Sequence, residues 1–152
     1  MSDSLTFMMG KYEALLLADR RYCRNHMWCL TTGTNRHRFG FTAYAIRLMK
    51  DVYFLDWCVN VGDLLALKQH IGNVESSKAQ SDLFSPIAGE LVGINQEMLK
   101  DPSGINVDGY GIGWLVEVAG SAEGTMTMQE YFQYLETNWE QTQRILKGQM
   151  GD

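Results

Sequence analysis

The chain has 152 residues, 45% hydrophobic and 20% charged, which suits one globular domain and is too short for two ordinary ones. Lys and Arg number 13 against 18 Asp and Glu. The resulting net charge of -5 offers a phosphate backbone little to bind, so we expect no nucleic-acid partner. No apolar run approaches the roughly 20 residues that span a bilayer, so we expect no membrane association. The N-terminus lacks signal-peptide features, and three cysteines do not form a disulfide framework, so we expect a cytoplasmic protein.

The first segment, residues 5–21, is predicted to be a helix, because its apolar residues recur at spacings of three and four. These residues are Leu5, Met8, Met9, Tyr12, Leu15 and Leu16. A helix this short is marginal alone, so we expect this N-terminal extension, residues 1–21, to pack on the rest of the domain.

From residue 22 to residue 118 the sequence changes to short aromatic and β-branched runs separated by turn residues, a pattern typical of β-strands. Strands are predicted at 27–31, 38–41, 52–57, 64–68, 71–75, 81–84, 91–95 and 114–118. A short helix over 43–50 and one helical turn over 96–99 interrupt them. Fifteen glycines with only two prolines agree with many tight turns.

The C-terminal segment is predicted to be a helix that begins at the capping box Thr127-Met128-Gln129-Glu130. We therefore expect a single domain with three parts: the extension 1–21, a β domain 22–124, and a C-terminal helix 125–152 packed on it. The fold class is a β-rich α+β fold with helices at both ends.

A weak internal repeat relates Gly62-Asp63-Leu64-Leu65-Ala66-Leu67 to Gly89-Glu90-Leu91-Val92-Gly93-Ile94. Two such copies can face each other across a two-fold axis and form a small β-sandwich. Between them, residues 71–86 read as two strands joined by small polar residues, which places Lys78 at a hairpin tip. Taken alone, an exposed lysine of this kind is usually only a solvated charge.

Four motifs, in the same order along the chain, resemble those of the glycine cleavage system H-protein family. They are Tyr22-Cys23-Arg24-Asn25-His26-Met27-Trp28, Gly40-Phe41-Thr42-Ala43-Tyr44-Ala45, Glu75-Ser76-Ser77-Lys78-Ala79-Gln80-Ser81-Asp82-Leu83-Phe84-Ser85-Pro86 and Asn106-Val107-Asp108-Gly109-Tyr110-Gly111-Ile112-Gly113-Trp114-Leu115. The resemblance runs from about residue 22 to the last helix. The third motif is similar to the family's lipoyl-lysine hairpin.

This resemblance implies a lipoyl-domain fold, the barrel-sandwich hybrid of two small antiparallel sheets. It also implies that lipoate is joined by an amide to the ε-amine of Lys78. Glu75, Gly62 and Gly89 are implied to be signals for the lipoate-attaching enzyme or turn determinants. The protein would be a covalent cofactor carrier and not an enzyme, and the sequence shows no nucleophile–base–acid set.

Some features depart from the family pattern. Met27 stands where the family has an acid, Cys23 and Cys29 flank that motif, Cys58 follows a predicted strand, and the N-terminal helix is long. Together these features most closely resemble the H-protein-like lipoate-binding proteins of heterodisulfide-reductase-like sulfur oxidation. That branch implies a carrier of sulfur-containing intermediates that serves a heterodisulfide-reductase-like complex and is reoxidised by dihydrolipoamide dehydrogenase.

The alternative is a glycine-cleavage carrier, which takes an aminomethyl group from glycine decarboxylase to an aminomethyltransferase on the same arm. A biotinyl carrier is disfavoured, because its lysine is typically flanked by methionines and Lys78 is flanked by Ser77 and Ala79. A module without lipoate is disfavoured by the intact lysine motif.

His26 either lines a resting pocket for the arm or satisfies a backbone carbonyl. The cysteines are expected to be small buried hydrophobes, and the functional alternative is that Cys23 or Cys29 forms a mixed disulfide or persulfide with the arm. No metal site is expected, because Cys23, His26 and Cys29 lack the second ligand pair of a structural zinc site.

His37 and His70 are expected at the surface. The run Gly109-Tyr110-Gly111-Ile112-Gly113 resembles a phosphate loop, but a strand and not a helix is predicted to follow it, so we expect a turn.

Overall fold

The computed structural model describes the backbone of residues 3–150 and the side chains as far as residue 144. Residues 1–2 of the predicted N-terminal extension and residues 151–152 of the predicted C-terminal helix lie outside the described residues. In the described part of the chain, no helix is long and apolar enough to cross a membrane.

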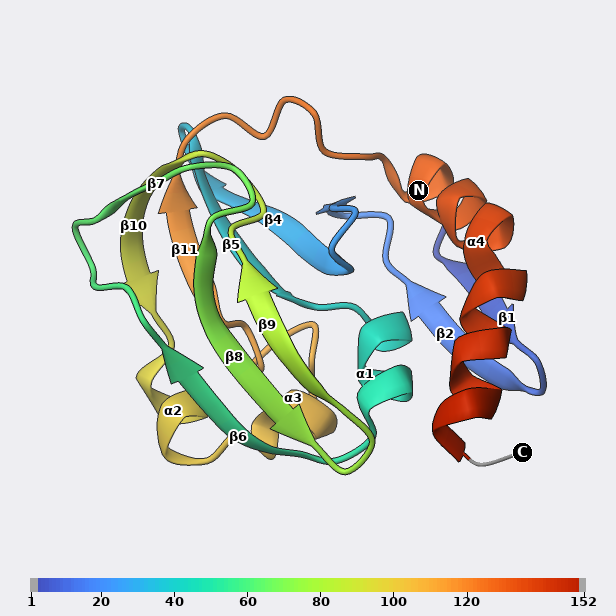
Figure 1. Cartoon of the computed structure of the whole chain (residues 1–152). Coiled ribbons are helices and arrows are strands. Elements are labelled where there is room, and N and C mark those ends of the chain that lie inside the picture. The colour runs from blue at the N-terminus through green and yellow to red at the C-terminus, as the bar shows by residue number, and fades with distance from the viewer. Residues whose placement is uncertain (1–2, 151–152) are drawn as a thin grey trace.

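Two antiparallel sheets form the centre of the molecule, and the smaller lies in front of the larger in Figure 1. The larger has the strand order β3-β4-β5-β11-β10-β7. Its strands are β3 (Arg21–Tyr22), β4 (Met27–Gly33), β5 (Arg36–Phe41), β7 (Leu64–Leu65), β10 (Gly89–Ile94) and β11 (Val116–Ala119). The smaller sheet has the order β6-β8-β9, from β6 (Val52–Trp57), β8 (His70–Ser76) and β9 (Gln80–Phe84). The predicted sandwich of two small antiparallel sheets is confirmed.

A continuous apolar core joins the two sheets, because the alternate side chains of their strands point inward. It includes Phe39 and Val116 from the larger sheet and Ile71, Val74 and Leu83 from the smaller one, all at most 5% exposed. The strand prediction for 64–68 is too long, because only Leu64–Leu65 pairs with β10.

Within residues 3–150, four helices flank the sheets. Two of them, α1 (Ala43–Met49) and α2 (Gln96–Lys100), agree with the predicted short helices. The third, α3 (Gly104–Val107), was not predicted. The predicted capping box starts α4 (Met128–Met150): the Thr127 N–H donates to Glu130 Oε1 at 2.8 Å, and the Glu130 N–H donates to Thr127 Oγ1 at 3.1 Å.

The N-terminal segment is a β-hairpin, so the predicted helix over 5–21 is wrong. Strand β1 (Leu5–Met9) pairs antiparallel with β2 (Tyr12–Leu16) across the two-residue turn Gly10–Lys11. Gly10 has φ +64°, which a type II′ turn requires at its first central position. Burial alternates along β1, as expected of a strand: Phe7 and Met9 are buried, while Met8 between them is 48% exposed.

This hairpin contacts α1 and α4 at one side of the molecule (Figure 1). A second apolar cluster lies between these elements and includes Phe7, Leu16, Tyr44, Tyr131 and Leu135. The N-terminal segment therefore holds α4 against the β domain.

His37 is 5% exposed, so its expected surface position is wrong. Its ring lies between two partners, with Nδ1 2.9 Å from Thr31 Oγ1 and Nε2 3.1 Å from the Gly120 carbonyl oxygen. These two contacts satisfy both ring nitrogens, which allows burial. His70 is exposed as expected. The residues 109–113 form a turn, as expected, and the Trp28 indole N–H donates to the Gly109 carbonyl at 2.9 Å.

Candidate functional site

Lys78 lies at the tip of the β8–β9 hairpin, and its side chain is exposed. The turn is closed by Ser76, whose N–H donates to the Ala79 carbonyl at 2.8 Å and whose Oγ accepts from the Ala79 N–H at 3.2 Å. Ser77 ties the tip to the start of β6. Its N–H donates to the Asp51 carbonyl at 2.9 Å, and its Oγ accepts from the Asp51 N–H at 3.2 Å. The backbone around Lys78 is therefore fixed while its side chain is free.

Glu75 lies opposite Gln80 in the same hairpin, and Gln80 Nε2 donates to Glu75 Oε1 at 2.6 Å. The carboxylate is thus held three residues before Lys78, on the strand that leads to the tip.

The two copies of the internal repeat face each other. Strands β7 and β10 pair antiparallel, with Leu65 opposite Gly89. Next to this pair, the Gly62 N–H donates to the Leu91 carbonyl at 2.7 Å, and the Leu91 N–H donates to the Asp63 carbonyl at 2.9 Å. The pairing agrees with the two-fold arrangement that the repeat predicted. It lies at the other end of β8 from the hairpin tip (Figure 1).

Both repeat glycines are required by the backbone. Gly62 has φ +102°, and Gly89 has φ +155°. A Cβ on Gly89 would lie 2.2 Å from the Ala119 carbonyl oxygen, whereas one on Gly62 would meet nothing within 4 Å. Glycine is therefore required at position 89 both by its φ and by the close approach of the neighbouring backbone.

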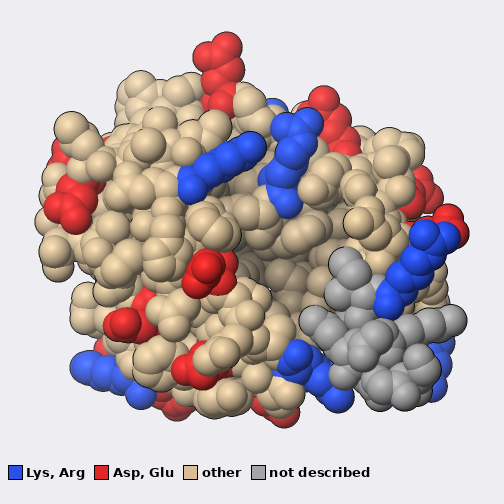
Figure 2. Space-filling model, in the orientation of Figure 1, with Lys and Arg blue, Asp and Glu red and all other residues tan. Residues whose placement is uncertain are grey.

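An apolar groove of about 330 Å³ begins beside the hairpin tip. Its lining residues are Asn25, His26, Phe41, Tyr44, Ala45, Leu48, Met49, Val74, Ala79, Ser81, Asp82, Leu83 and Thr142. Figure 2 shows a hollow on this face between the positions of β9 and α4, with mainly uncharged walls. Asp82 is the one carboxylate among the described residues that line the groove.

His26 lines this groove, and its hydrogen-bond partner is a side chain and not a backbone carbonyl. Its Nδ1 lies 2.9 Å from the hydroxyl of Tyr131, and its ring centroid lies 4.9 Å from that of Tyr44. Burial lowers the pKa of His26 to about 4. The imidazole is therefore neutral at pH 7 and presents no charge to the groove.

Sequence reasoning did not single out Tyr44, Leu48, Asp82 and Thr142 as groove residues. Tyr44 and Asp82 lie within the second and third family-like motifs, so those motifs contained a signal for them. Thr142 lies on α4, and its place in the groove depends on how that helix packs.

The three cysteines fall into two classes. Cys23 is 5% and Cys29 2% exposed, as expected of buried hydrophobes, whereas Cys58 is exposed, contrary to that expectation. Burial raises the pKa of the Cys23 thiol and raises that of Cys29 to about 11. Both thiols are therefore protonated at pH 7. Cys58 Sγ lies 3.9 Å from Nδ1 of His70.

Met27, which replaces the family's acid, is 1% exposed and belongs to the core that joins the two sheets. Among the residues whose side chains are described, no group of three or more His, Cys, Asp or Glu is placed to hold a metal ion.

A family model described as "Glycine cleavage H-protein" matches residues 20–140. The chain is 36% identical over 108 residues to the glycine cleavage system H protein of Carboxydothermus hydrogenoformans, which covers 71% of this chain and 82% of that protein. It is 33% identical over 129 residues to the mitochondrial glycine cleavage system H protein 2 of Arabidopsis thaliana, which covers 82% of this chain and 81% of that protein.

A solved structure has the same fold. The crystal structure of a glycine cleavage system H protein from Mycobacterium marinum superimposes with a TM-score of 0.70 at 32% identity, over 81% of this chain and 98% of that one. These relatives are named as glycine cleavage proteins and give no support to the sulfur-oxidation branch. The matched residues, the sequence identities and the shared fold show that the chain belongs to the glycine cleavage H-protein family.

Proposed function

We propose that this chain is a lipoyl carrier of the glycine cleavage type, with lipoate joined to Lys78. Proteins of this family carry lipoate covalently on a lysine. The carrier would move an aminomethyl group between glycine decarboxylase and an aminomethyltransferase. The observation that carries the proposal is an exposed Lys78 on a fixed hairpin tip, beside an apolar groove of about 330 Å³.

The residues around Lys78 fit an acyl arm of this kind. Amide formation removes the ammonium charge of Lys78, so an apolar arm can lie in the groove without burying an unpaired charge. Leu48, Met49 and Leu83 offer apolar contacts there, and Asp82 offers a carboxylate to a cationic group. The bound lipoate supplies a disulfide that is reduced to a dithiol, and the protein supplies presentation and shelter.

His26 is proposed to line the resting place of the arm. Because the imidazole of His26 is neutral at pH 7, its ring can form a hydrogen bond with the arm and does not repel a cationic load on it. Cys23 and Cys29 are buried and protonated, and we give them no part in the transfer.

The other proposed partners are a lipoate-attaching enzyme and dihydrolipoamide dehydrogenase, and the proposed location is the cytoplasm. Glu75 lies three residues before Lys78 and accepts a hydrogen bond from Gln80. We propose that the attaching enzyme recognises Glu75 together with Lys78. Gly62 and Gly89 lie at the other end of β8 from the tip, which favours a role as turn determinants over direct recognition.

The proposal is tested in two steps on natively expressed protein. Intact mass should show one lipoyl group, which Lys78→Arg abolishes and the matched surface variant Lys100→Arg retains. The lipoylated protein should then support glycine decarboxylase-dependent bicarbonate exchange, and Lys78→Arg should not. A fully lipoylated protein without exchange would overturn the glycine-cleavage assignment, and a lipoylated Lys78→Arg variant would overturn the site.

The second candidate is a sulfur carrier that serves a heterodisulfide-reductase-like complex. Its basis is the sequence departure at Met27, which is 1% exposed in the core and is not among the residues that line the groove. A protein that is lipoylated, inactive in the exchange and able to accept sulfane sulfur would favour this second candidate.

A further inference from the structure

The N-terminal hairpin lies outside the residues that the family model matches, which begin at residue 20. It places the exposed ring of Tyr12 among three cations. The ring centroid lies 5.4 Å from Lys11 Nζ, 4.9 Å from Arg47 Cζ and 5.3 Å from Lys50 Nζ. We name these four residues the Tyr12 patch. Lys11 and Tyr12 come from the hairpin, whereas Arg47 and Lys50 come from α1 and its C-terminal cap.

The Tyr12 patch is a concentrated positive surface on an acidic protein of net charge -5. Its three cationic heads surround one ring centroid, so their potentials add over a Debye length of about 8 Å. Within the part of the chain whose side chains are described, no carboxylate lies within 4.0 Å of these cations. The patch is therefore available to pair with carboxylates of another molecule.

The Lys50 end of the patch is connected to the hairpin tip that carries Lys78. Lys50 is followed by Asp51, whose carbonyl accepts from the Ser77 N–H at 2.9 Å and whose N–H donates to Ser77 Oγ at 3.2 Å. Ser77 immediately precedes Lys78. A protein large enough to bind the hairpin tip and reach the ε-amine of Lys78 therefore meets the Lys50 end of the Tyr12 patch first.

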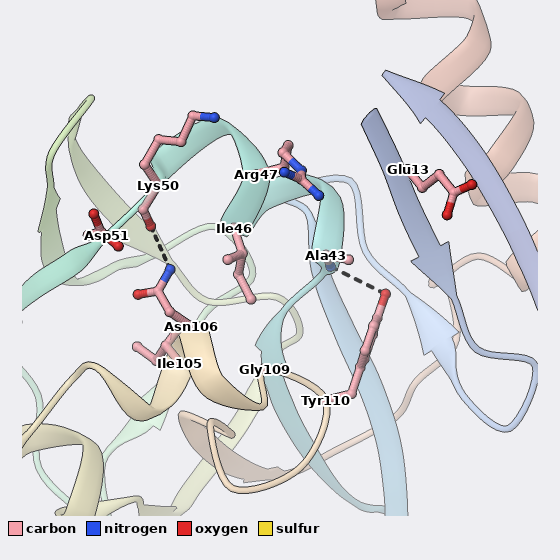
Figure 3. A pocket seen from close by; sticks show the side chains of 10 residues that line it. All are labelled: Glu13, Ala43, Ile46, Arg47, Lys50, Asp51, Ile105, Asn106, Gly109 and Tyr110. Carbon is pink, nitrogen blue, oxygen red and sulfur yellow. Dashed lines mark hydrogen bonds between the residues drawn. The ribbon is translucent and has the colours of Figure 1, made fainter. Parts of the chain in front are cut away.

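A recess of about 410 Å³ adjoins the patch, between β2, α1 and α3 (Figure 3). Arg47 and Lys50 line one part of it, and the carboxylates of Glu13 and Asp51 line other parts. The Asn106 side chain is already engaged, since its amide donates to the Lys50 carbonyl at 2.7 Å. The recess offers space and mixed polar groups for side chains of a docked protein.

We propose that the Tyr12 patch is a docking surface for a carboxylate-bearing surface of the enzyme that acylates Lys78. This inference rests on the proposed function, in which Lys78 carries the cofactor. The attaching enzyme must reach the Lys78 amine itself, across only four methylene groups, so its surface contacts the residues beside the tip. Enzymes that use the finished arm can stay further from the tip, so the patch suits the attaching enzyme best.

The acylation also changes the charge of this surface. The ammonium group of Lys78 first gives one proton to a base, which removes its positive charge, and the neutral amine then attacks the carbonyl of an activated acyl donor. An amide bond forms, the bond to the leaving group breaks, the leaving group departs with the electron pair, and the nitrogen loses a proton. One positive charge beside the Tyr12 patch is thereby removed. An acidic partner surface then binds the product less tightly than the substrate, which favours release after modification.

The test compares two double variants with the same change in net charge. Lys11→Glu with Arg47→Glu reverses the patch, and Lys68→Glu with Lys100→Glu reverses two exposed cations on other elements. The measurement is the initial rate of lipoyl transfer to the unmodified protein by the lipoate-attaching enzyme of the same organism, followed by intact mass. At low salt, the patch variant should lose about tenfold in kcat/KM through a higher KM, and the loss should shrink as salt is raised. The control variant should react at the wild-type rate.

A patch variant modified at the wild-type rate would overturn the docking surface and leave the lipoyl site intact. Equal slowing of both double variants would also overturn it, because only net charge would then matter. Wild-type protein that is not modified at Lys78 would instead overturn the proposed function, and the inference with it. If the glutamate variant fails to fold, Lys11→Gln with Arg47→Gln should still raise KM, by a smaller factor.

Discussion

Nδ1 of His26 lies 2.9 Å from the hydroxyl of Tyr131, which joins the loop before β4 to α4 across 105 positions of the chain. Tyr131 is fully buried, and its ring stacks on that of Tyr22 with centroids 4.8 Å apart. The groove wall at His26 is therefore built on a packed aromatic cluster. A charge on His26 would therefore be buried against this cluster, which is why the pKa of His26 is lowered.

Acid should destabilise the protein through His26. Burial lowers the pKa of His26 to about 4 in the folded state, while the unfolded chain keeps about 6.5. Between these values the unfolded state binds more protons, so the free energy of unfolding falls as pH drops from about 6.5 toward 4. The contribution of this one group is on the order of 2 kcal/mol.

The measurement is urea unfolding at pH 7 and pH 5. His26→Asn, which tolerates the φ of +64° at this position, should show a weaker loss of stability between the two pH values than the wild type. An unchanged pH dependence in His26→Asn would contradict the assignment to His26.

The two repeat glycines should differ in their tolerance of a methyl group. Gly89→Ala should destabilise by about 2–4 kcal/mol, because the new Cβ would lie 2.2 Å from the Ala119 carbonyl oxygen. Gly62→Ala should cost only about 1 kcal/mol, the strain of its positive φ, because nothing lies within 4 Å. Urea unfolding measures both values.

The same two variants test the role of these glycines in recognition. If folded Gly62→Ala and Gly89→Ala proteins are lipoylated at the wild-type rate, both glycines are turn determinants. A loss of lipoylation in a variant that stays folded under the assay conditions would make that glycine a recognition signal.

Thiol reagents should distinguish Cys58 from the other two cysteines. Cys23 and Cys29 are buried, and their raised pKa values leave almost no thiolate at pH 8, whereas Cys58 is exposed. We expect one thiol per chain to react rapidly in the native protein and three after unfolding. Cys58→Ser should abolish the rapid reaction, and a second rapid thiol in the wild type would contradict the buried placement.

The strands and the hairpin that carries Lys78 could be predicted because their signals are local. Turn residues, aromatic runs and the motif around Lys78 each lie within a few positions of the structure that they specify. The capping box of α4 is local in the same way, with Thr127 and Glu130 three residues apart. Local signals also predicted the pairing of β7 with β10, because the two repeats have similar sequences.

The groove could be predicted only in part, because its walls come from distant segments. Tyr131 meets His26, and Thr142 lines the groove beside β9, through the packing of α4, which no local pattern specifies. The burial of His37 depends likewise on the Gly120 carbonyl, 83 residues away. Tertiary contacts of this kind override local expectations of exposure.

The N-terminal segment was mispredicted because its apolar residues fit two periods. Met8, Met9 and Tyr12 have helical spacing, yet Phe7 and Met9 alternate with exposed neighbours in the structure. Gly10 between the two halves was the signal against a helix, since a glycine inside a helical pattern often marks a turn.

Substitutions at adjacent positions decide between the two conformations. The buried Phe7 ring lies 5.7–5.9 Å, between centroids, from the rings of Tyr44, Phe132 and Trp139. Phe7→Ala should therefore destabilise by about 3–5 kcal/mol. Met8→Ala, at the exposed neighbour, should change the free energy of unfolding by less than about 0.5 kcal/mol. A helix over 5–21 would bury Met8 in its apolar stripe and leave Phe7 outside it, so a severe loss in Met8→Ala with a mild one in Phe7→Ala would contradict the hairpin.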